Sequence, residues 1–221
     1  MKTRFINFAA ILIIIVFSTS GIVIAQDKNK NNKNNKVILF NGKDLSNWDF
    51  KLKDSSVDPS KVFTIKDGTI HIAGDPFGYM RTKEIYSEYK LHVEWRWPVE
   101  ATNSGVFVHA QQPDTIWLKC VECQLKAGSA GDFVCMNGAE MNERTDKTKP
   151  SVKKMAESSE KPVGEWNTMD VVCKDNTIEV TVNGVLQNKA TNVNLNKGSI
   201  CLQSEGKDVE FKNVFLTKLN E

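Results

Sequence analysis

The sequence lacks a net charge large enough to attract a polyanion. Its 221 residues contain 29 Lys and Arg against 27 Asp and Glu, which gives a formal charge of +2. Lys2 and Arg4 precede an apolar run at the N-terminus, and subtracting these two cations from +2 leaves a net charge of 0. A neutral chain has no long-range field for nucleic acid, so we expect no nucleic-acid partner.

Helical periodicity is almost absent after residue 36. Apolar and polar residues instead alternate over short segments, separated by turn signals such as Lys66-Asp67-Gly68 and Asn183-Gly184. Alternate side chains of a strand face opposite sides of its sheet. Many short strands with closely spaced turns are typical of a sandwich. The sequence predicts an all-β, antiparallel β-sandwich in which one sheet curves to form a groove. A shift of apolar parity at Lys212-Asn213 predicts a β-bulge.

Cysteine is scarce and odd in number. The chain has five cysteines, so disulfides cannot include every thiol. Cys120-x-x-Cys123 has a spacing found in zinc and redox sites, but no second Cys/His pair stands nearby. On a strand, moreover, these two side chains face opposite sides. We therefore expect buried or partly paired cysteines rather than a zinc site.

The only long apolar run lies at the N-terminus and ends at Val23-Ile24-Ala25. It predicts a signal peptide over residues 1–25, cleaved after Ala25, and export to the periplasm or the extracellular space. An uncleaved N-terminal anchor is the alternative. No cysteine follows the run, which argues against a lipoprotein, and cleavage would leave no stable membrane span. Residues 26–36 form an Asn/Lys-rich tract that predicts a disordered leader, and residues 37–221 form one β-sandwich domain.

Three consecutive strand-like segments, Tyr89–Arg96, Ser104–Ala110 and Lys119–Leu125, carry the candidate site. Their alternation turns apolar residues toward a core and polar residues to the other face. Two interpretations are open, because antiparallel sheets commonly have one solvated face and polar side chains also build sites. The polar residues of the predicted face are His92, Glu94, Arg96, His109, Glu122 and Gln124.

Residues Asn137 to Pro162 form the longest stretch without strand periodicity. Long loops inside a compact domain are usually functional or disordered. We expect this segment to form a lid over the polar face, with a short surface helix over Ser151–Ser158.

Short segments in a fixed order from Val37 to the C-terminus resemble a known family. They are Leu39–Trp48, Asn103–Phe107, Glu122–Gln124, Gly131-Asp132, Gly164–Asn167, Leu202–Gly206 and Phe211–Asn213. The family is secreted and is named for 3-keto-disaccharide hydrolase, 3-keto-glucoside 1,2-lyase and 3-keto-2-hydroxy-glucal hydratase activities. The resemblance implies a concanavalin-A-like or laminin-G-like jelly roll, which agrees with the strand pattern. The chain departs from it at Lys212, where many members carry Arg, so a bidentate fork is lost there.

The implied substrate is a glycoside or oligosaccharide oxidised at C3. A C3 ketone acidifies the hydrogen on C2, so a base can remove it and the enolate can expel the aglycone from C1. The outcome is elimination, hydration or net hydrolysis. This chemistry needs a base, stabilisation of the C3 oxygen and an acid for the leaving oxygen. Ordinary glycosidases instead use two carboxylates.

The resemblance also implies roles for the candidate residues. Glu122 or His109 is the expected base, and Arg96 is the expected charge for the enolate oxygen. A divalent metal ion held by His109, Glu122 and Glu94 is an alternative to Arg96. Substrate hydroxyls are expected to contact Asn103, Gln124, Asp132, Gln203 and Glu205.

Aromatic residues divide into two expected groups. Phe107, Tyr79 or Trp117 are expected to stack on a sugar ring, whereas Trp95 and Trp166 are assigned to the core. Two competing functions remain from the sequence. One is a non-catalytic carbohydrate-binding or adhesion domain, and the other is a two-carboxylate glycosidase that uses Glu94 and Glu122. The oligomeric state stays open.

Overall fold

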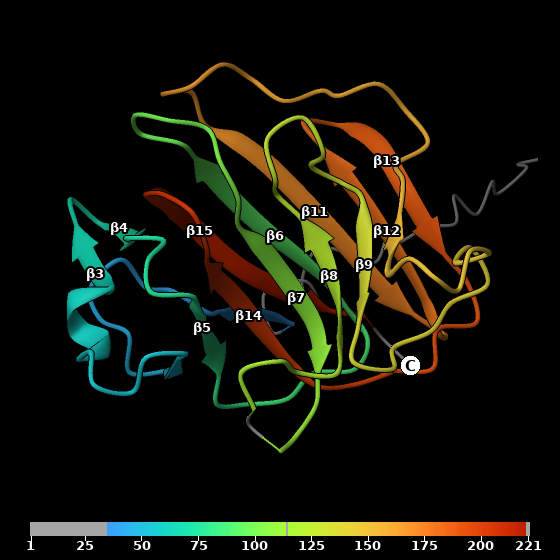
Figure 1. The fold of residues 1–221 in the computed structure, drawn as a ribbon, viewed down its shortest axis with the longest axis horizontal. Coiled ribbons are helices and arrows are strands. Elements are labelled where there is room, and N and C mark those ends of the chain that lie inside the picture. Colours follow the sequence, from blue (N-terminus) through green and yellow to red (C-terminus); the bar gives the residue numbers. More distant parts are fainter. Residues whose placement is uncertain (1–34, 114, 220–221) are drawn as a thin grey trace, which may run out of the picture.

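The computed structural model describes residues 35–113 and 115–219. The predicted signal peptide and all but the end of the predicted leader lie outside this range. Two antiparallel sheets stack on each other, which confirms the predicted all-β sandwich (Figure 1). The described helix is confined to one 3-10 turn, η1 (Pro59–Lys61). Thus no helix in the described ranges has the length and apolar character to span a membrane.

One sheet, called sheet A here, has eight strands in the order β13-β12-β11-β6-β15-β4-β3, with β1 paired to β15. Its longest pairings join β6 to β11 on one side and to β15 on the other. Its strands are β1 (Lys36–Ile38), β3 (Phe63–Lys66), β4 (Thr69–Ile72), β6 (Tyr89–Arg96), β11 (Asn167–Lys174), β12 (Thr177–Val182), β13 (Val185–Ala190) and β15 (Val209–Lys218).

The other sheet, sheet B, has seven strands in the order β10-β9-β8-β7-β14-β5-β2. In Figure 1 its strands β7, β8 and β9 lie in front of β6 and β11 of sheet A. Its strands are β2 (Trp48–Leu52), β5 (Gly78–Thr82), β7 (Gly105–Ala110), β8 (Cys120–Gln124), β9 (Phe133–Met136), β10 (Ser151–Val152) and β14 (Ser199–Ser204).

The core lies between the two sheets and follows from the alternation of each strand. In β6, Tyr89, Leu91, Val93 and Trp95 are fully buried, whereas the residues between them face outward. Each large apolar side chain buried in this way contributes roughly 1.5–3 kcal/mol to folding. Trp95 therefore lies in the core, as the sequence predicts.

Turn residues confirm the predicted hairpins and bulge. Asp67 (φ 50°) and Gly68 (φ 73°) connect β3 to β4, and Asn183 (φ 49°) and Gly184 (φ 81°) connect β12 to β13. Positive φ at both central positions defines a type I′ turn, which Asn-Gly and Asp-Gly favour. Asn213 also has positive φ, and the register of β15 against β6 shifts between Lys212 and Phe215.

The segment from Asn137 to Pro162 does not form the predicted helix, and it reaches the side of Glu122 only through Asn137 and Pro150, so it does not cover that face as the predicted lid. Residues Ser151–Val152 form β10, which extends sheet B beside β9. Further along, the Met155 amide donates to Gln187 O at 2.7 Å, and Ser159 Oγ donates to Val182 O at 2.7 Å. The segment thus joins the β9 edge of sheet B to the β13 edge of sheet A. The prediction failed because hydrogen bonds to neighbouring strands, which leave no periodicity in the sequence, hold this segment.

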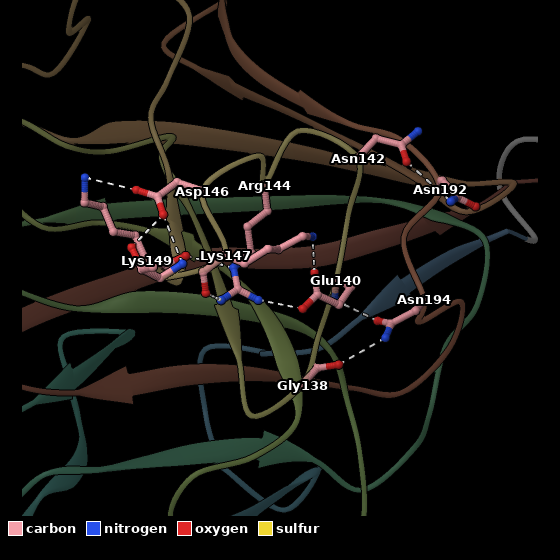
Figure 2. A network of polar contacts seen from close by, with 10 residues as sticks. Gly138, Glu140, Asn142, Arg144, Asp146, Lys147, Lys149, Asn192 and Asn194 are labelled. Carbon is pink, nitrogen blue, oxygen red and sulfur yellow. Dashed lines mark hydrogen bonds and ion pairs between the residues drawn. The ribbon is translucent and has the colours of Figure 1, made fainter.

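A polar network holds the first part of the same segment (Figure 2). Glu140 accepts hydrogen bonds from Arg144 and Lys147, both at 2.6 Å, and its amide donates to Asn194 Oδ1 at 2.9 Å. Arg144 also binds the backbone carbonyls of Lys147 and Lys149. These contacts account for an ordered segment without regular strands.

All five cysteines are buried, and none forms a disulfide. Cys123 packs in the core between the sheets. Cys120 packs in a smaller cluster with Tyr79 and Phe107 on the outer face of sheet B. The predicted opposite orientation of Cys120 and Cys123 is therefore confirmed.

Candidate active site

The expected convergence of Glu94 and Arg96 with Glu122 is wrong. Strand β6 belongs to sheet A, whereas β8, which carries Glu122, belongs to sheet B. Arg96 donates to Glu210 at 2.6 Å, and Glu94 accepts from Asn213 at 2.7 Å, both on the outer face of sheet A. The alternation within each strand was read correctly, but the chain changes sheets after β6, so the polar row of β6 lies on the opposite side of the molecule from Glu122.

Trp166 also departs from its predicted place in the core. It lies on the outer face of sheet A, where Arg96 stands 4.7 Å and Lys212 4.1 Å from its ring. Lys212 in addition lies 3.4 Å from Glu94. These cation–π and ion-pair contacts give Lys212 a role in packing this face.

His109 is not on the face of Glu122 either. It has a positive φ of 54°, and the register of β14 against β7 shifts beside it, so the alternation of β7 is broken there. Its ring packs edge-on against Tyr89 of the core, with centroids 5.7 Å apart. Its nitrogens lie 3.1 Å from Leu195 O and 3.2 Å from Ser87 O. Burial lowers the pKa of His109, and the two carbonyls oppose that shift.

Glu122 is a buried carboxylic acid on the outer face of sheet B. Its exposed fraction is 5%. Burial raises the pKa of Glu122 to about 8, and the negative charge of Glu205 adds to the shift. A Cβ atom at Gly105 would collide with Glu122 Oε1, so the carboxyl group lies over this glycine. A glycine on β7 therefore makes room for the carboxyl group.

Three acceptor oxygens of this face are buried and have no hydrogen-bond donor within the described residues. They are Glu122 Oε1, Gln203 Oε1 and Asn103 Oδ1. Asn103 forms an isolated bridge with Glu205, which lies just beyond Gln203 and the end of β14. Buried polar atoms are normally paired, and leaving one unpaired costs about 1–3 kcal/mol. The arrangement is suited to a ligand that carries several hydroxyl donors.

Trp117 lies at the mouth of the site. Its side chain is 53% exposed, its ring centroid lies 4.7 Å from that of Phe77, and its carbonyl accepts from Asn137 at 3.1 Å. The pocket has a volume of about 500 Å³, a size typical of small-molecule sites. Its lining residues are Trp117, Glu122, Val134, Cys135, Met136, Asn137, Pro150, Gln203 and Glu205.

The remaining predicted binding residues lie outside this lining. Asp132 is buried, with Lys153 at 2.9 Å and the Lys154 amide at 2.9 Å, so it anchors the segment after β10. Gln124 lies near the site at the end of β8, where Oε1 accepts from the amides of Leu125 and Lys126. Tyr79 of β5 and Phe107 of β7 are buried beside each other, with ring centroids 6.2 Å apart. They pack against each other on this face and do not line the pocket.

The residues named for a metal ion do not fit one. Glu122 and His109 face opposite sides of sheet B, and Glu94 belongs to sheet A. Both nitrogens of His109 face backbone carbonyls. Within the described ranges, no group of three or more His, Cys, Asp or Glu is placed to hold a metal ion.

Sequence reasoning missed the apolar wall of the pocket. Val134, Met136 and Pro150 line it, although no polar signal marks them. The one available signal was the outward parity of Val134 and Met136 on the predicted strand Phe133–Met136, which left apolar side chains facing solvent.

The sequence from residue 35 to residue 217 matches the family described as the 3-keto-alpha-glucoside-1,2-lyase-like domain. The chain belongs to this family. Its resemblance by ordered segments is therefore confirmed. The curated proteins give no match to the chain. Membership suggests a carbohydrate-active, glycosyl-hydrolase-like protein.

Solved structures share the jelly-roll fold of this 3-keto-alpha-glucoside-1,2-lyase-like domain. A candidate glycosyl hydrolase from Parabacteroides distasonis has a TM-score of 0.63 at 20% identity, covering 86% of this chain and 97% of that one. The carbohydrate binding module CBM66 from Bacillus subtilis has a TM-score of 0.56 at 8% identity, covering 76% and 93%. The beta-glucanase of Bacillus licheniformis has a TM-score of 0.54 at 12% identity, covering 83% and 97%. At these identities the likeness shows the fold.

Proposed function

We propose that this protein cleaves 3-keto-glycosides by removing the C2 proton, with Glu122 as the base. The observation that carries the proposal is the buried, unpaired carboxyl group of Glu122 in the pocket of sheet B, with a pKa raised to about 8. A base works best when its pKa lies near the operating pH, and a pKa of about 8 makes Glu122 a stronger base than an ordinary carboxylate. Family membership supplies the substrate class.

In the proposed reaction Glu122 both removes a proton and returns it. The Glu122 carboxylate takes the C2 proton, and the electron pair of that bond forms the enolate with negative charge on the C3 oxygen. The enolate then re-forms the ketone, makes the C1–C2 double bond and breaks the bond from C1 to the aglycone oxygen. Protonated Glu122 gives its proton to the leaving oxygen. Addition of water across the C1–C2 double bond gives free 3-keto-glucose.

Amide side chains replace Arg96 in stabilising the enolate. Gln203 lines the pocket with Glu122, Asn103 lies just outside the lining, where it pairs with Glu205, and each of the two amides has a carbonyl oxygen without a donor. Their amide N–H groups can donate to the C3 oxygen, while their carbonyl oxygens accept from sugar hydroxyls. Trp117, with its other face on Phe77, offers a surface for the apolar side of the sugar ring.

The test is incubation of the purified protein with a 3-keto-glucoside, followed by detection of the unsaturated keto sugar and of 3-keto-glucose. We expect turnover in the wild type and a loss of at least 100-fold in kcat for Glu122→Gln, as is typical when a positioned acid–base group is removed. Glu179→Gln is the matched control, because Glu179 pairs with Lys189 on the surface of sheet A. Equal turnover in the wild type and Glu122→Gln would remove Glu122 from the mechanism.

The pH profile separates this reaction from ordinary glycoside hydrolysis. A base must be ionised, so kcat/KM should rise with pH and level off above about 8. An acid would give the opposite profile. Binding of sugars without any product would instead support the carbohydrate-binding alternative.

We also propose that the protein is exported. The support is the apolar run that ends at Val23-Ile24-Ala25. N-terminal sequencing of the protein from its native cells should start at Gln26, and recovery of an intact N-terminus on membranes would favour the uncleaved anchor.

A further inference from the structure

The pocket changes character at Glu122. On the β14 side of Glu122 lie Gln203 and Glu205, which offer acceptor oxygens. On the β9 side lies Val134, which pairs directly with Glu122 in the sheet register. The catalytic carboxyl group therefore stands at the boundary between a polar and an apolar half.

The apolar half is formed by Val134, Met136 and Pro150. Phe133 and Cys135 of β9 pack into the core, so Val134 and Met136 must face outward, and both stay partly exposed. Outward positions of an antiparallel sheet usually carry polar residues. Cys120 Sγ lies 3.6 Å from Met136 Sδ and steadies the Met136 side chain from below. Apolar side chains kept open toward a pocket indicate an apolar occupant.

We propose that this apolar half binds the aglycone, and that the aglycone is an aromatic ring rather than a second sugar. This inference rests on the proposed function. A sugar on the β9 side would leave hydroxyls facing Val134, Met136 and Pro150, none of which is a good hydrogen-bond partner, and the neighbouring Asn137 already donates its amide to Trp117 O at 3.1 Å. An aromatic ring buries apolar area there and makes a favourable contact with the Met136 sulfur. The preferred substrate is then an aryl 3-keto-glucoside.

The dimensions of the sheet allow both groups to bind at once. Strands β14 and β9 are separated by three strand spacings, roughly 14 Å. The sugar ring lies on the β14 side under Trp117, with C1 directed toward β9. Glu122, between the two groups, is then positioned near both C2 and the leaving oxygen, as the proposed proton return requires.

The kinetic experiment compares 4-nitrophenyl 3-keto-α-glucoside with a 3-keto-disaccharide in the wild type and in the double variant Val134→Thr/Met136→Gln. Both replacements preserve approximate size, and both positions face outward. We expect kcat/KM for the aryl substrate to fall at least tenfold more than kcat/KM for the disaccharide. Val185→Thr, at an exposed position of β13, is the control and should change neither. Equal losses for both substrates would overturn the proposal.

A binding experiment keeps the proposal independent of turnover. Calorimetry with Glu122→Gln measures the affinity for unoxidised phenyl α-glucoside and methyl α-glucoside, with and without the change at Val134 and Met136. We expect the phenyl ligand to bind at least tenfold more tightly, and this advantage to disappear in the triple variant. Equal affinities for the phenyl and methyl ligands would refute the proposal that the apolar half binds an aromatic ring. Tighter binding of the phenyl ligand, without turnover of any 3-keto-glycoside by the wild type, would refute the proposed reaction but would still support an aromatic-binding role for the apolar half.

Discussion

Replacing Glu122 by Gln should stabilise the protein, and the gain should depend on pH. In the folded protein the carboxyl group keeps its proton up to a pKa of about 8, because the pocket buries it and Glu205 lies nearby. In the unfolded chain the same group ionises near 4.5. The folded state therefore binds more protons between these two values, so stability falls as pH rises through this window. Gln at the same position does not titrate.

The magnitude follows from the size of the pKa shift. A shift from 4.5 to about 8 corresponds to a cost of about 5 kcal/mol once the pH is above 8. At pH 7 the cost is about 3 kcal/mol, and at pH 5 it is about 1 kcal/mol or less. Because other groups titrate alike in both proteins, the difference between wild type and Glu122→Gln isolates this one carboxyl group. The advantage of the variant should thus grow by about 4 kcal/mol from pH 5 to pH 9.

The assay is urea unfolding at pH 5, 7 and 9, with the free energy of unfolding extrapolated to water. Glu179→Gln is the control, because Glu179 forms an exposed pair with Lys189 and should show a nearly constant difference of less than about 0.5 kcal/mol. A difference between wild type and Glu122→Gln that stays flat from pH 5 to pH 9 would refute the reasoning, since Glu122 would then have an ordinary pKa.

Four further substitutions test the placement of side chains. Gly105→Ala should lower kcat at least tenfold in the turnover assay, because its Cβ displaces the Glu122 carboxyl group; unchanged kcat would contradict that contact. Arg96→Ala should leave kcat/KM within twofold, and it should lower the free energy of unfolding in urea by about 1–3 kcal/mol because the hydrogen bond to Glu210 is lost. A large fall in kcat/KM would contradict the place of Arg96 on sheet A. Asp132→Asn should speed tryptic cleavage after Lys153, because the ion pair weakens; cleavage at the wild-type rate would argue against the anchor. Trp95→Ala should cost about 3–5 kcal/mol in the same unfolding assay, and a cost below 1 kcal/mol would contradict its full burial.

Local chemistry made much of the fold predictable from the sequence. Alternation over Tyr89–Arg96 matches the whole of β6, because each of its apolar residues faces the core. Asp67-Gly68 and Asn183-Gly184 determine their hairpins, since these residues accept positive φ. The apolar parity shift at Lys212-Asn213 marks a bulge in β15.

The site was only partly predictable, because alternation assigns a face to each strand but not a sheet. Glu94 and Glu122 each face outward as expected, yet they do so from different sheets. His109 was misplaced for another reason, since a backbone irregularity at its own position reverses its direction. The wall at Val134 and Met136 was missed although the alternation of β9 turns both residues outward, because apolar residues in a predicted strand are readily assigned to the core. Glu122 was found because it lies on the polar face of a predicted strand, and Gln203 was found because it belongs to the segment Leu202–Gly206 that resembles the family.

The claim that Glu122 removes the C2 proton is tested most directly by comparing kcat/KM for a 3-keto-glucoside that carries hydrogen or deuterium at C2, across a range of pH. We predict a primary isotope effect together with a rate that rises with pH up to about 8. Equal rates for the two isotopes, with activity that falls as pH rises through the same value, would show that Glu122 acts as an acid on the glycosidic oxygen and would contradict the proposed mechanism.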